Sequence, residues 1–321
     1  MKKRILYVVQ FIITVALFYI IVHRFQFTLD GLTLKFQKPV WLVFSLYFSI
    51  ILIPILAAAR WNVFLGYTGI HATFNELLKI NFESIFWGTF LPSSDGFAAI
   101  RLYKIERKYA EVPGKAGSTV VAEKLLGFIV LCLFALIFSF KLIFIPSIFL
   151  FRLIILLILL ILIVSMLVIF QKTFYDSISN FLLKSQLSAK IAIFISNLYD
   201  SLVKLPKLKM MVSAVPLIIS IQLCTFINVY LLFKIVGIEI PISYHLAIVP
   251  VIQIISLIPL TLSGLGIREG AFVYFYGFLG VKPEIAFAVS LLNFLILNGI
   301  PAVIGGIISI TTQLQKRGIS R

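Results

Sequence analysis

The sequence has very few charged residues. Only 12% of its 321 residues are Asp, Glu, Lys or Arg, whereas soluble domains carry about 25%. Apolar residues make up 61% of the chain, and its mean hydropathy is +1.11. A chain so poor in charge lacks the polar surface that a soluble fold presents to water. The composition therefore predicts an integral membrane protein.

Cysteine and histidine are also scarce, with two and three residues respectively. Cys132 and Cys224 fall within apolar runs and have no CxxC spacing, so neither a zinc site nor a disulfide framework is predicted. His23, His71 and His245 are isolated near the ends of apolar runs and are expected at the membrane interface. No Ser-His-Asp set and no paired carboxylates on a soluble face occur. We therefore assign no catalytic residue, metal or cofactor.

Acidic residues are outnumbered, since 28 Lys and Arg stand against 12 Asp and Glu for a formal charge of +16. In a soluble protein this balance would suggest nucleic acid as a partner. Here the basic residues lie mainly between apolar runs, as expected for loops beside an anionic cytoplasmic leaflet. Nucleic acid is therefore not an expected partner.

Long apolar runs fill most of the chain, and a helix needs about 20 apolar residues to cross the hydrocarbon core. Seven runs meet this length: Ile5–Val22, Val40–Ala59, Ser118–Phe140, Ile148–Phe170, Met211–Phe233, Ile242–Ile258 and Ile285–Ile310. Two more, Leu77–Leu91 and Leu260–Leu279, are interrupted by Pro, Ser and Gly. Backbone that leaves a helix at membrane depth must be buried in protein or line a wet cavity. These two stretches are therefore predicted to be broken or re-entrant helices.

The predicted fold class is all-α, a polytopic integral membrane protein with about 7–8 transmembrane helices and one or two broken ones. We expect one transmembrane domain over residues 1–321. Its halves are residues 1–140, with a broken helix at 77–100, and residues 211–312, with a broken helix at 259–280. Between them lie a linker span at 148–170 and an amphipathic cytoplasmic loop at 171–210. That loop is expected to lie on the membrane surface or to pack under the bundle.

The two broken stretches share a spacing. Pro92 precedes Arg101 by nine residues and Pro259 precedes Arg268 by nine, and the two prolines are 167 residues apart. Each motif follows two spans and leads through a short polar turn into a long apolar helix. The pattern indicates an internal repeat, an architecture in which interrupted helices meet at the substrate site. We therefore expect Pro92–Arg101 and Pro259–Gly270 to meet near the middle of the bundle.

Basic residues also predict orientation. Residues 101–117 and 172–209 are rich in Lys and Arg, which places them, with the N-terminus, on the cytoplasmic side of the cell membrane. Lys316, Arg317 and Arg321 predict the same side for the C-terminus. Both termini share a side only after an even number of crossings. With seven clear spans, either one of the two broken stretches crosses fully or the C-terminus departs from the charge rule.

Ionisable groups at membrane depth are candidate functional residues because burying their charge is costly. The candidates for substrate binding are Glu83, Asp95, Arg101, Glu123, Gly264, Gly266, Arg268 and Glu269. Arginine matches phosphate with a planar two-pronged fork, and glycines and helix N-termini favour an approaching anion. One arginine at each broken helix thus predicts a site for a phosphate-bearing headgroup.

Helix geometry turns neighbouring residues about 100° apart. We therefore expect Arg268 and Glu269 not to pair with each other, and Arg268 to pair with Glu83 or Glu123 or to await a lipid phosphate. Simpler interpretations stand beside these. Arg101 is then an ordinary basic residue at a helix end, Glu123-Lys124 an interfacial pair, and Arg60-Trp61 an interfacial anchor.

The stretch from Pro259 to Ala271, with Gly264, Gly266, Arg268 and Glu269, resembles the signature of the lysylphosphatidylglycerol synthase transmembrane region. This is a flippase-like membrane domain. The segment from Phe90 to Arg101, followed by Glu123-Lys124, is similar to the first motif of the same family. It departs from that motif in having Ser93 where glycine is common and Asp95 before Gly96. The resemblance extends in layout from Trp41 to Ile310.

The resemblance implies translocation of a lipid headgroup. In two-part family members this domain moves aminoacylated phosphatidylglycerol, which a separate soluble domain makes; the sequence printed here contains no such domain, so we expect no aminoacyl-transferase activity. The expected partners are membrane lipids with phosphate-bearing headgroups, and a separate lipid-modifying enzyme. Two other functions stay open: an intramembrane enzyme on a lipid-linked substrate, and a non-transporting partner subunit of such an enzyme.

Overall fold

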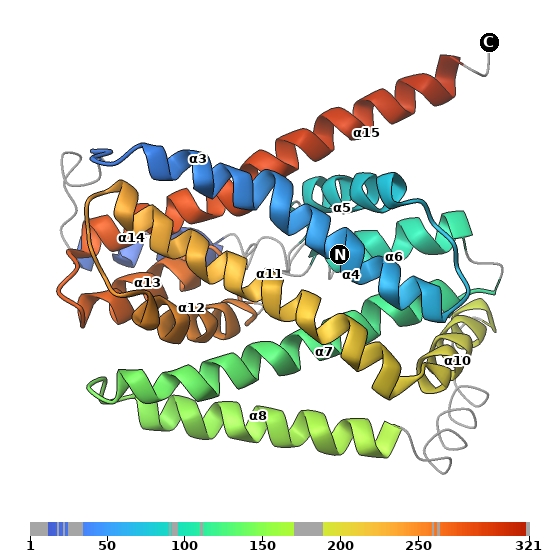
Figure 1. Ribbon diagram of the computed structural model, residues 1–321, viewed down its shortest axis with the longest axis horizontal. Helices are drawn as coiled ribbons and strands as arrows, with labels where there is room; N and C mark the ends of the chain where they lie inside the picture. Colours follow the sequence, from blue (N-terminus) through green and yellow to red (C-terminus); the bar gives the residue numbers. More distant parts are fainter. Residues whose placement is uncertain are drawn as a thin grey trace.

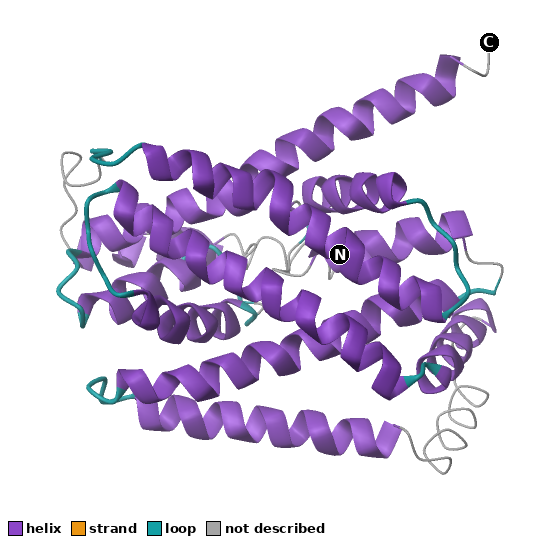
Figure 2. Ribbon diagram, in the orientation of Figure 1, coloured by secondary structure: helices purple, strands orange, loops and turns teal. Residues whose placement is uncertain are grey.

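The computed structural model describes residues 12–17, 19–21, 23–24, 35–89, 91, 96–109, 112–169, 189–258, 260–261 and 264–318. Within these residues the chain is helical throughout, joined by short turns, and contains no strand (Figures 1 and 2). The all-α polytopic class is confirmed.

Five helical segments among the described residues are long and apolar enough to cross a bilayer: Val40–Tyr67, Lys115–Leu142, Ile148–Ser165, Leu208–Ile235 and Pro283–Leu314. Each corresponds to a predicted span. The first consists of α3 (Val40–Tyr47), the π turn η1 (Phe48–Leu52) and α4 (Ile53–Tyr67). The second consists of α7 (Lys115–Phe138) and the 3₁₀ turn η2 (Ser139–Leu142), and the third and fourth lie within α8 (Ile148–Ile169) and α11 (Lys207–Ile235). The last comprises α14 (Pro283–Phe294), the π turn η4 (Leu295–Gly299) and most of α15 (Ile300–Gly318). Of the predicted span Ile5–Val22, residues 12–17 and 19–21 are described, and they are helical.

Short helices form two hairpins. The first contains α5 (Phe74–Thr89) and α6 (Gly96–Tyr109), and the second contains α12 (Ile242–Ser256) and α13 (Ile267–Gly277). The prediction that Ile242–Ile258 crosses the bilayer is wrong. Its helix has 15 residues and is about 22 Å long at 1.5 Å per residue, short of a hydrocarbon core about 30 Å thick. The apolar run is long enough, but the chain turns back into α13, and α12 packs against it.

The order of elements repeats along the chain. A long helix, a short hairpin and a second long helix occur first as α4, α5–α6 and α7, and again as α11, α12–α13 and α14–α15. The two hairpins lie at opposite ends of the long axis, and α4 and α11 run side by side between them (Figure 1). Each hairpin packs on a long helix from the other half, α5 on α15 and α12 on α7. The two halves therefore pack into each other.

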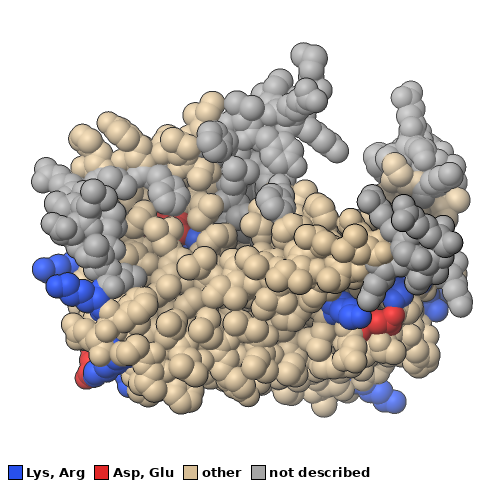
Figure 3. All heavy atoms as spheres, turned by 90° about the horizontal axis from the view of Figure 1, so that it is seen from above, with Lys and Arg blue, Asp and Glu red and all other residues tan. Residues whose placement is uncertain are grey.

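The outer surface suits a bilayer. In Figure 3 most visible charged side chains lie toward the two ends of the long axis, and the flank between them is almost entirely uncharged. Along α8, large apolar side chains such as Leu150, Leu157 and Leu160 are more than half exposed. Exposed leucines on this scale are stable in lipid and unstable in water.

Basic side chains and α10 (Ala189–Lys204) lie at one end of the bundle, where α5 begins and α6 ends. There Lys108 and Tyr109 both bond the Glu76 carboxylate, and these two contacts hold its pKa at about 2. Helix α10 packs against the start of α7, and the backbone of its Phe194 lies close to Gly114. Residues 171–188 of the predicted amphipathic loop lie outside the described residues, but its second part packs under the bundle.

Candidate functional site

A cavity of about 730 Å³ lies between the two hairpins. The end of α5 and the start of α6 contribute Gly88, Thr89 and Phe97, and the end of α12 and the first turn of α13 contribute Ser256, Leu257 and Arg268. The long helices α4, α7, α11 and α14 complete its walls. Segments about half the chain apart thus share one cavity, as the repeated Pro-to-Arg spacing predicts. Phe90, Pro92–Asp95, Pro259 and Leu262–Ser263 lie outside the described residues.

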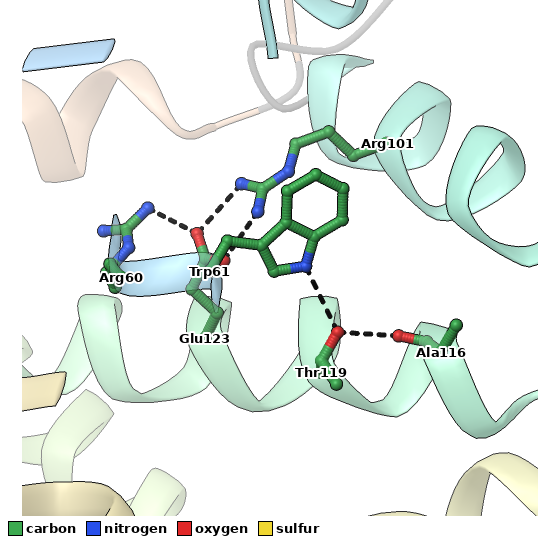
Figure 4. Close-up of polar contacts among 6 residues, drawn as sticks. All are labelled: Arg60, Trp61, Arg101, Ala116, Thr119 and Glu123. Atoms are coloured by element: carbon green, nitrogen blue, oxygen red, sulfur yellow. Dashed lines mark hydrogen bonds and ion pairs between the residues drawn. The ribbon is translucent and has the colours of Figure 1, made fainter. Parts of the chain in front are cut away.

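Three charged side chains from three helices meet at the cavity wall (Figure 4). Glu123 of α7 accepts two hydrogen bonds from Arg101 of α6, from Nη1 to Oε1 at 2.9 Å and from Nη2 to Oε2 at 2.7 Å. Arg60 of α4 also bonds Oε1 of Glu123. Arg101 and Glu123 are each 2% exposed. One buried carboxylate thus serves two guanidinium groups, and the triad carries a net positive charge.

An aromatic ring holds the arginine of this triad in place. The Arg101 guanidinium lies 4.0 Å from the centroid of the Trp61 ring, a geometry that attracts the cation to the π face. The Trp61 indole N–H donates to Thr119 Oγ1 at 3.2 Å, and the Thr119 hydroxyl donates to the Ala116 carbonyl at 2.7 Å (Figure 4). Arg101 does not line the cavity, whereas Arg60 and Glu123 do.

The triad lies beside a further cation. Lys124, the next residue on α7, lines the cavity with its Nζ 4.2 Å from the centroid of the Phe97 ring. The Nε atoms of Arg60 and Arg101 are buried and have no hydrogen-bond partner among the described residues. The first half of the chain therefore lines the cavity with Arg60 and Lys124, and the Glu123 carboxylate is shared by Arg60 and Arg101.

The second hairpin pairs its charges locally. Glu269 is fully buried and bends back over the start of α13, where Oε2 accepts the Gly266 N–H at 2.5 Å. Oε1 accepts from Arg268 Nε at 3.0 Å and from the Ser290 hydroxyl at 3.3 Å. The Arg268 guanidinium lies 4.6 Å from the Phe294 ring centroid. A carboxylate thus occupies the anion-binding start of α13, and the pair is neutral.

Comparison with known proteins agrees with this layout. A model of the lysylphosphatidylglycerol synthase transmembrane region matches residues 7–305. The chain is also 26% identical over 287 residues to the UPF0104 membrane protein MJ1595 of Methanocaldococcus jannaschii, a match that covers 83% of this chain and 84% of that protein. The family match extends over both hairpins and the long helices as far as the start of α15. The chain belongs to the lysylphosphatidylglycerol synthase transmembrane region family.

The candidates predicted from the sequence occupy different places in this family member. Glu123 and Arg268 line the cavity, while Arg101 and Glu269 hold them from behind. Gly264 and Gly266 adopt φ of 73° and 89°, in the left-handed region that glycine tolerates, and form the turn into α13. Glu83 is buried away from the cavity and pairs with Lys104 across α5 and α6. Asp95 lies outside the described residues.

The expectation that Arg268 and Glu269 cannot pair is wrong. Their backbones diverge as expected, but both side chains are long, and the Glu269 carboxylate is drawn back to the helix start by the Gly266 N–H. Arg268 folds over the first turn to reach it. The predicted pairing of Arg268 with Glu83 or Glu123 is also wrong. Glu83 binds Lys104, and Glu123 binds Arg60 and Arg101.

Several simpler interpretations are also wrong. Arg101 and Glu123 are core residues and not interfacial ones. Arg60 and Trp61 do not mark a helix end, because α4 continues to Tyr67 and buries Trp61 completely. His245 is fully buried, with Nδ1 2.8 Å from the Tyr276 hydroxyl.

The site includes residues that were not predicted from the sequence. Besides Arg60, the cavity is lined by four amide side chains, those of Gln222, Gln253, Asn293 and Asn298. Each lies inside a predicted apolar run, where polar side chains are rare and mark pathways or binding sites. An amide within an apolar run was therefore the feature of the sequence that could have identified these residues. Among the described residues no group of three His, Cys, Asp or Glu could hold a metal ion.

Proposed function

We propose that this protein binds lipids with anionic, phosphate-bearing headgroups in its central cavity and translocates them across the membrane. The observation that supports the proposal is the positive charge at the cavity. Three arginines, Arg60, Arg101 and Arg268, lie in or directly behind the wall, and they share two carboxylates, Glu123 and Glu269, which leaves one positive charge in excess among these five residues.

The energetics favour an anion in the cavity. An uncompensated charge at membrane depth is unfavourable because lipid cannot solvate it. A phosphate beside Arg60 offsets the net positive charge of Arg60, Arg101 and Glu123, and arginine binds it with two parallel hydrogen bonds. The remaining walls are largely apolar, with Ile53 and Phe128 among them, and suit the adjoining acyl chains. The cavity thus matches an amphiphile whose polar end is anionic.

The arrangement of the hairpins supports translocation as well as binding. They reach the cavity from opposite ends of the bundle (Figure 1), so movement of either one would open the site toward a different membrane face. Interrupted helices that meet at a repeat interface are typical of transporters that use alternating access. Each hairpin packs on the other half, α5 on α15 and α12 on α7, so opening one changes contacts of both halves.

For orientation we propose that the N-terminus and the basic end with α10 face the cytoplasm of a cell whose plasma membrane holds the protein. If the N-terminal helix crosses, each hairpin returns to the side it entered from, and the five long segments bring the total to six crossings. Both termini then lie on one side. No broken stretch has to cross fully, because Ile242–Ser256 is not a span.

The test is a translocation assay in proteoliposomes that contain fluorescent phosphatidylglycerol, with dithionite bleaching of the outer leaflet. We expect the wild-type protein to expose inner-leaflet lipid to bleaching and Arg60→Gln to lose most of this activity. Lys38→Gln is the matched control, because it removes a cation from an exposed pair with Glu239 at 47% side-chain exposure. Protein-free vesicles give the background rate.

Each result bears on the proposal. Translocation that falls in Arg60→Gln and persists in Lys38→Gln supports it. Equal activity in wild type and Arg60→Gln contradicts the role of the positive cavity. Chemical change of the lipid would favour an intramembrane enzyme, and neither binding nor movement would favour a non-transporting partner subunit; either result overturns the proposal. An enzyme would also need an unpaired acid or nucleophile, and both described carboxylates at the site are paired.

A further inference from the structure

Amide side chains form a second polar set in the cavity, apart from the charged one. Gln222 and Thr225 lie three residues apart on α11, and Gln253 and Ser256 three apart on α12, so each pair shares one helix face. Asn293 and Asn298 come from the last long segment. No hydrogen bond to any other described residue is made by the side chains of Gln222, Gln253 and Asn298.

A π turn brings the two asparagines to the same cavity. Residues five apart in a regular α-helix point about 140° away from each other. Asn293 lies just before η4 and Asn298 lies within it. In η4 the helix widens to the i→i+5 pattern, and both asparagines line the cavity. Asn293 is held from behind, since its Oδ1 accepts from Asn228 Nδ2 at 3.3 Å, and Asn228 accepts from the Ser45 hydroxyl at 2.7 Å. The distortion thus adds Asn298 to the polar set.

The hydroxyl groups at the cavity are arranged as acceptors. Thr225 Oγ1 donates to the Ile221 carbonyl at 2.9 Å, and Ser256 Oγ donates to the Ile252 carbonyl at 2.7 Å. Their protons are used within the helix, which leaves oxygen lone pairs for a donor in the cavity. Amides both donate and accept. The set therefore complements a group that also does both, and the hydroxyl is the simplest such group.

Among the described residues, the cavity wall offers no free carboxylate to a cationic headgroup. An ammonium group binds most strongly to a carboxylate that no other cation occupies. Of the described residues, the carboxylates at the site are Glu123, shared by Arg60 and Arg101, and Glu269, held by Arg268. The net positive charge of Arg60, Arg101 and Glu123 repels a second cation.

From these contacts we infer that the cavity selects phosphodiester lipids whose headgroup beyond the phosphate is uncharged and hydroxylated, such as glycerol or a sugar-like polyol, over lipids with an ammonium or aminoacyl headgroup. The inference rests on the proposed function and specifies its substrate. Cations bind the phosphate, and Gln222, Gln253 and Asn298 bind the hydroxyls. An amide at membrane depth without a partner is unfavourable, so a hydroxylated headgroup is favoured over one that leaves these amides bare.

The test measures binding to the purified full-length protein by titrating soluble short-chain lipids and following the melting temperature. Phosphatidylglycerol and phosphatidylinositol carry hydroxyls; phosphatidylmethanol has the same phosphodiester charge without them; phosphatidylethanolamine and lysylphosphatidylglycerol carry ammonium groups. We expect the hydroxylated lipids to bind about tenfold more tightly than phosphatidylmethanol, from one or two additional hydrogen bonds. The two ammonium lipids should bind more weakly than phosphatidylmethanol.

Variants separate the amides from the cations. Gln253→Leu with Asn298→Leu should reduce the preference for phosphatidylglycerol over phosphatidylmethanol to about twofold or less, with phosphatidylmethanol affinity unchanged. The matched control is Gln313→Leu, which alters an exposed amide on α15 away from the cavity. The melting temperature without lipid shows that each variant is folded.

The outcomes distinguish this inference from the proposed function. Equal affinity for phosphatidylmethanol and phosphatidylglycerol, tight binding of lysylphosphatidylglycerol, or an unchanged preference in the amide variant would overturn the polyol site and leave lipid binding in place. Binding of no anionic lipid would overturn the proposed function itself. A preference for hydroxylated lipids that disappears only in the amide variant supports the inference.

Discussion

Arg101 and Glu123 form a two-pronged ion pair in the interior of the first half, with N–O distances of 2.9 and 2.7 Å and 2% exposure of each residue. They come from α6 and α7, so the pair joins the first hairpin to a long helix. Arg60 approaches the same carboxylate from α4. Three helices thus depend on one buried negative charge.

Loss of that charge should be worse than loss of one arginine. Glu123→Gln leaves Arg60 and Arg101 facing each other without a counter-ion, and we expect it to lower the free energy of unfolding by about 4 kcal/mol. Arg101→Gln retains the Arg60 pair and should lower it by less. The double variant should be more stable than Glu123→Gln alone, because one repelling cation is gone. Thermal denaturation of the four purified proteins measures this, and simple additivity of the two changes would contradict a shared carboxylate.

Arg268 and Glu269 form a second buried ion pair that single and double variants can test. Arg268→Gln leaves Glu269 fully buried without its cation, and we expect a loss of about 2–3 kcal/mol, since the arginine itself is 12% exposed. Glu269→Gln in the same chain should restore part of this, because an amide oxygen still accepts the Gly266 N–H. Arg268→Lys should be intermediate, as it retains charge but loses the planar fork. Melting temperatures check the series, and a wild-type value for Arg268→Gln would argue against a structural pair.

Gly305 allows α15 and α5 to approach closely. A Cβ atom at this position would lie 2.0 Å from the Phe82 carbonyl oxygen, which is backbone and cannot move aside without moving α5. We expect Gly305→Ala to lower stability by about 3 kcal/mol. Gly66→Ala is the control, since nothing lies within 4 Å of that position, and alanine there should be neutral or stabilising. Equal melting temperatures for the two variants would contradict the close contact.

Orientation can be read from the opposite ends of α7. Lys108 lies at the end of α6 beside the start of α7, and Lys141 lies in η2 at its far end. We expect an impermeant maleimide added to intact cells to label Lys141→Cys and not Lys108→Cys. The native Cys132 and Cys224 are buried and should give little background. The reverse labelling pattern would show that the basic end faces outward.

The sequence by itself determined the class of this protein. A helix is the form in which a single apolar segment satisfies its own backbone hydrogen bonds in lipid, so composition and run length were enough to predict an all-α membrane fold. Helix-breaking residues after Leu91 and around Gly264 indicated the two turns, because backbone groups without helical hydrogen bonds must be buried in protein or line a wet cavity. The motif around Arg268 and Glu269 was specific enough to indicate the family.

Only the tertiary structure decided which polar residues form the site and how they pair. The run at Ile242–Ile258 is apolar enough to cross, but packing against α13 and α7 makes it half of a hairpin. From the sequence, Arg60 was predicted to lie at the end of a span. In the structure α4 continues past Arg60, and α6 and α7 bring Arg101 and Glu123 to it. Hydropathy describes the free energy of transferring each residue by itself into lipid. It does not include the stabilisation that a partner on another helix provides. Charge pairing at membrane depth is a property of that three-dimensional arrangement, because the favourable energy arises only when the partners meet.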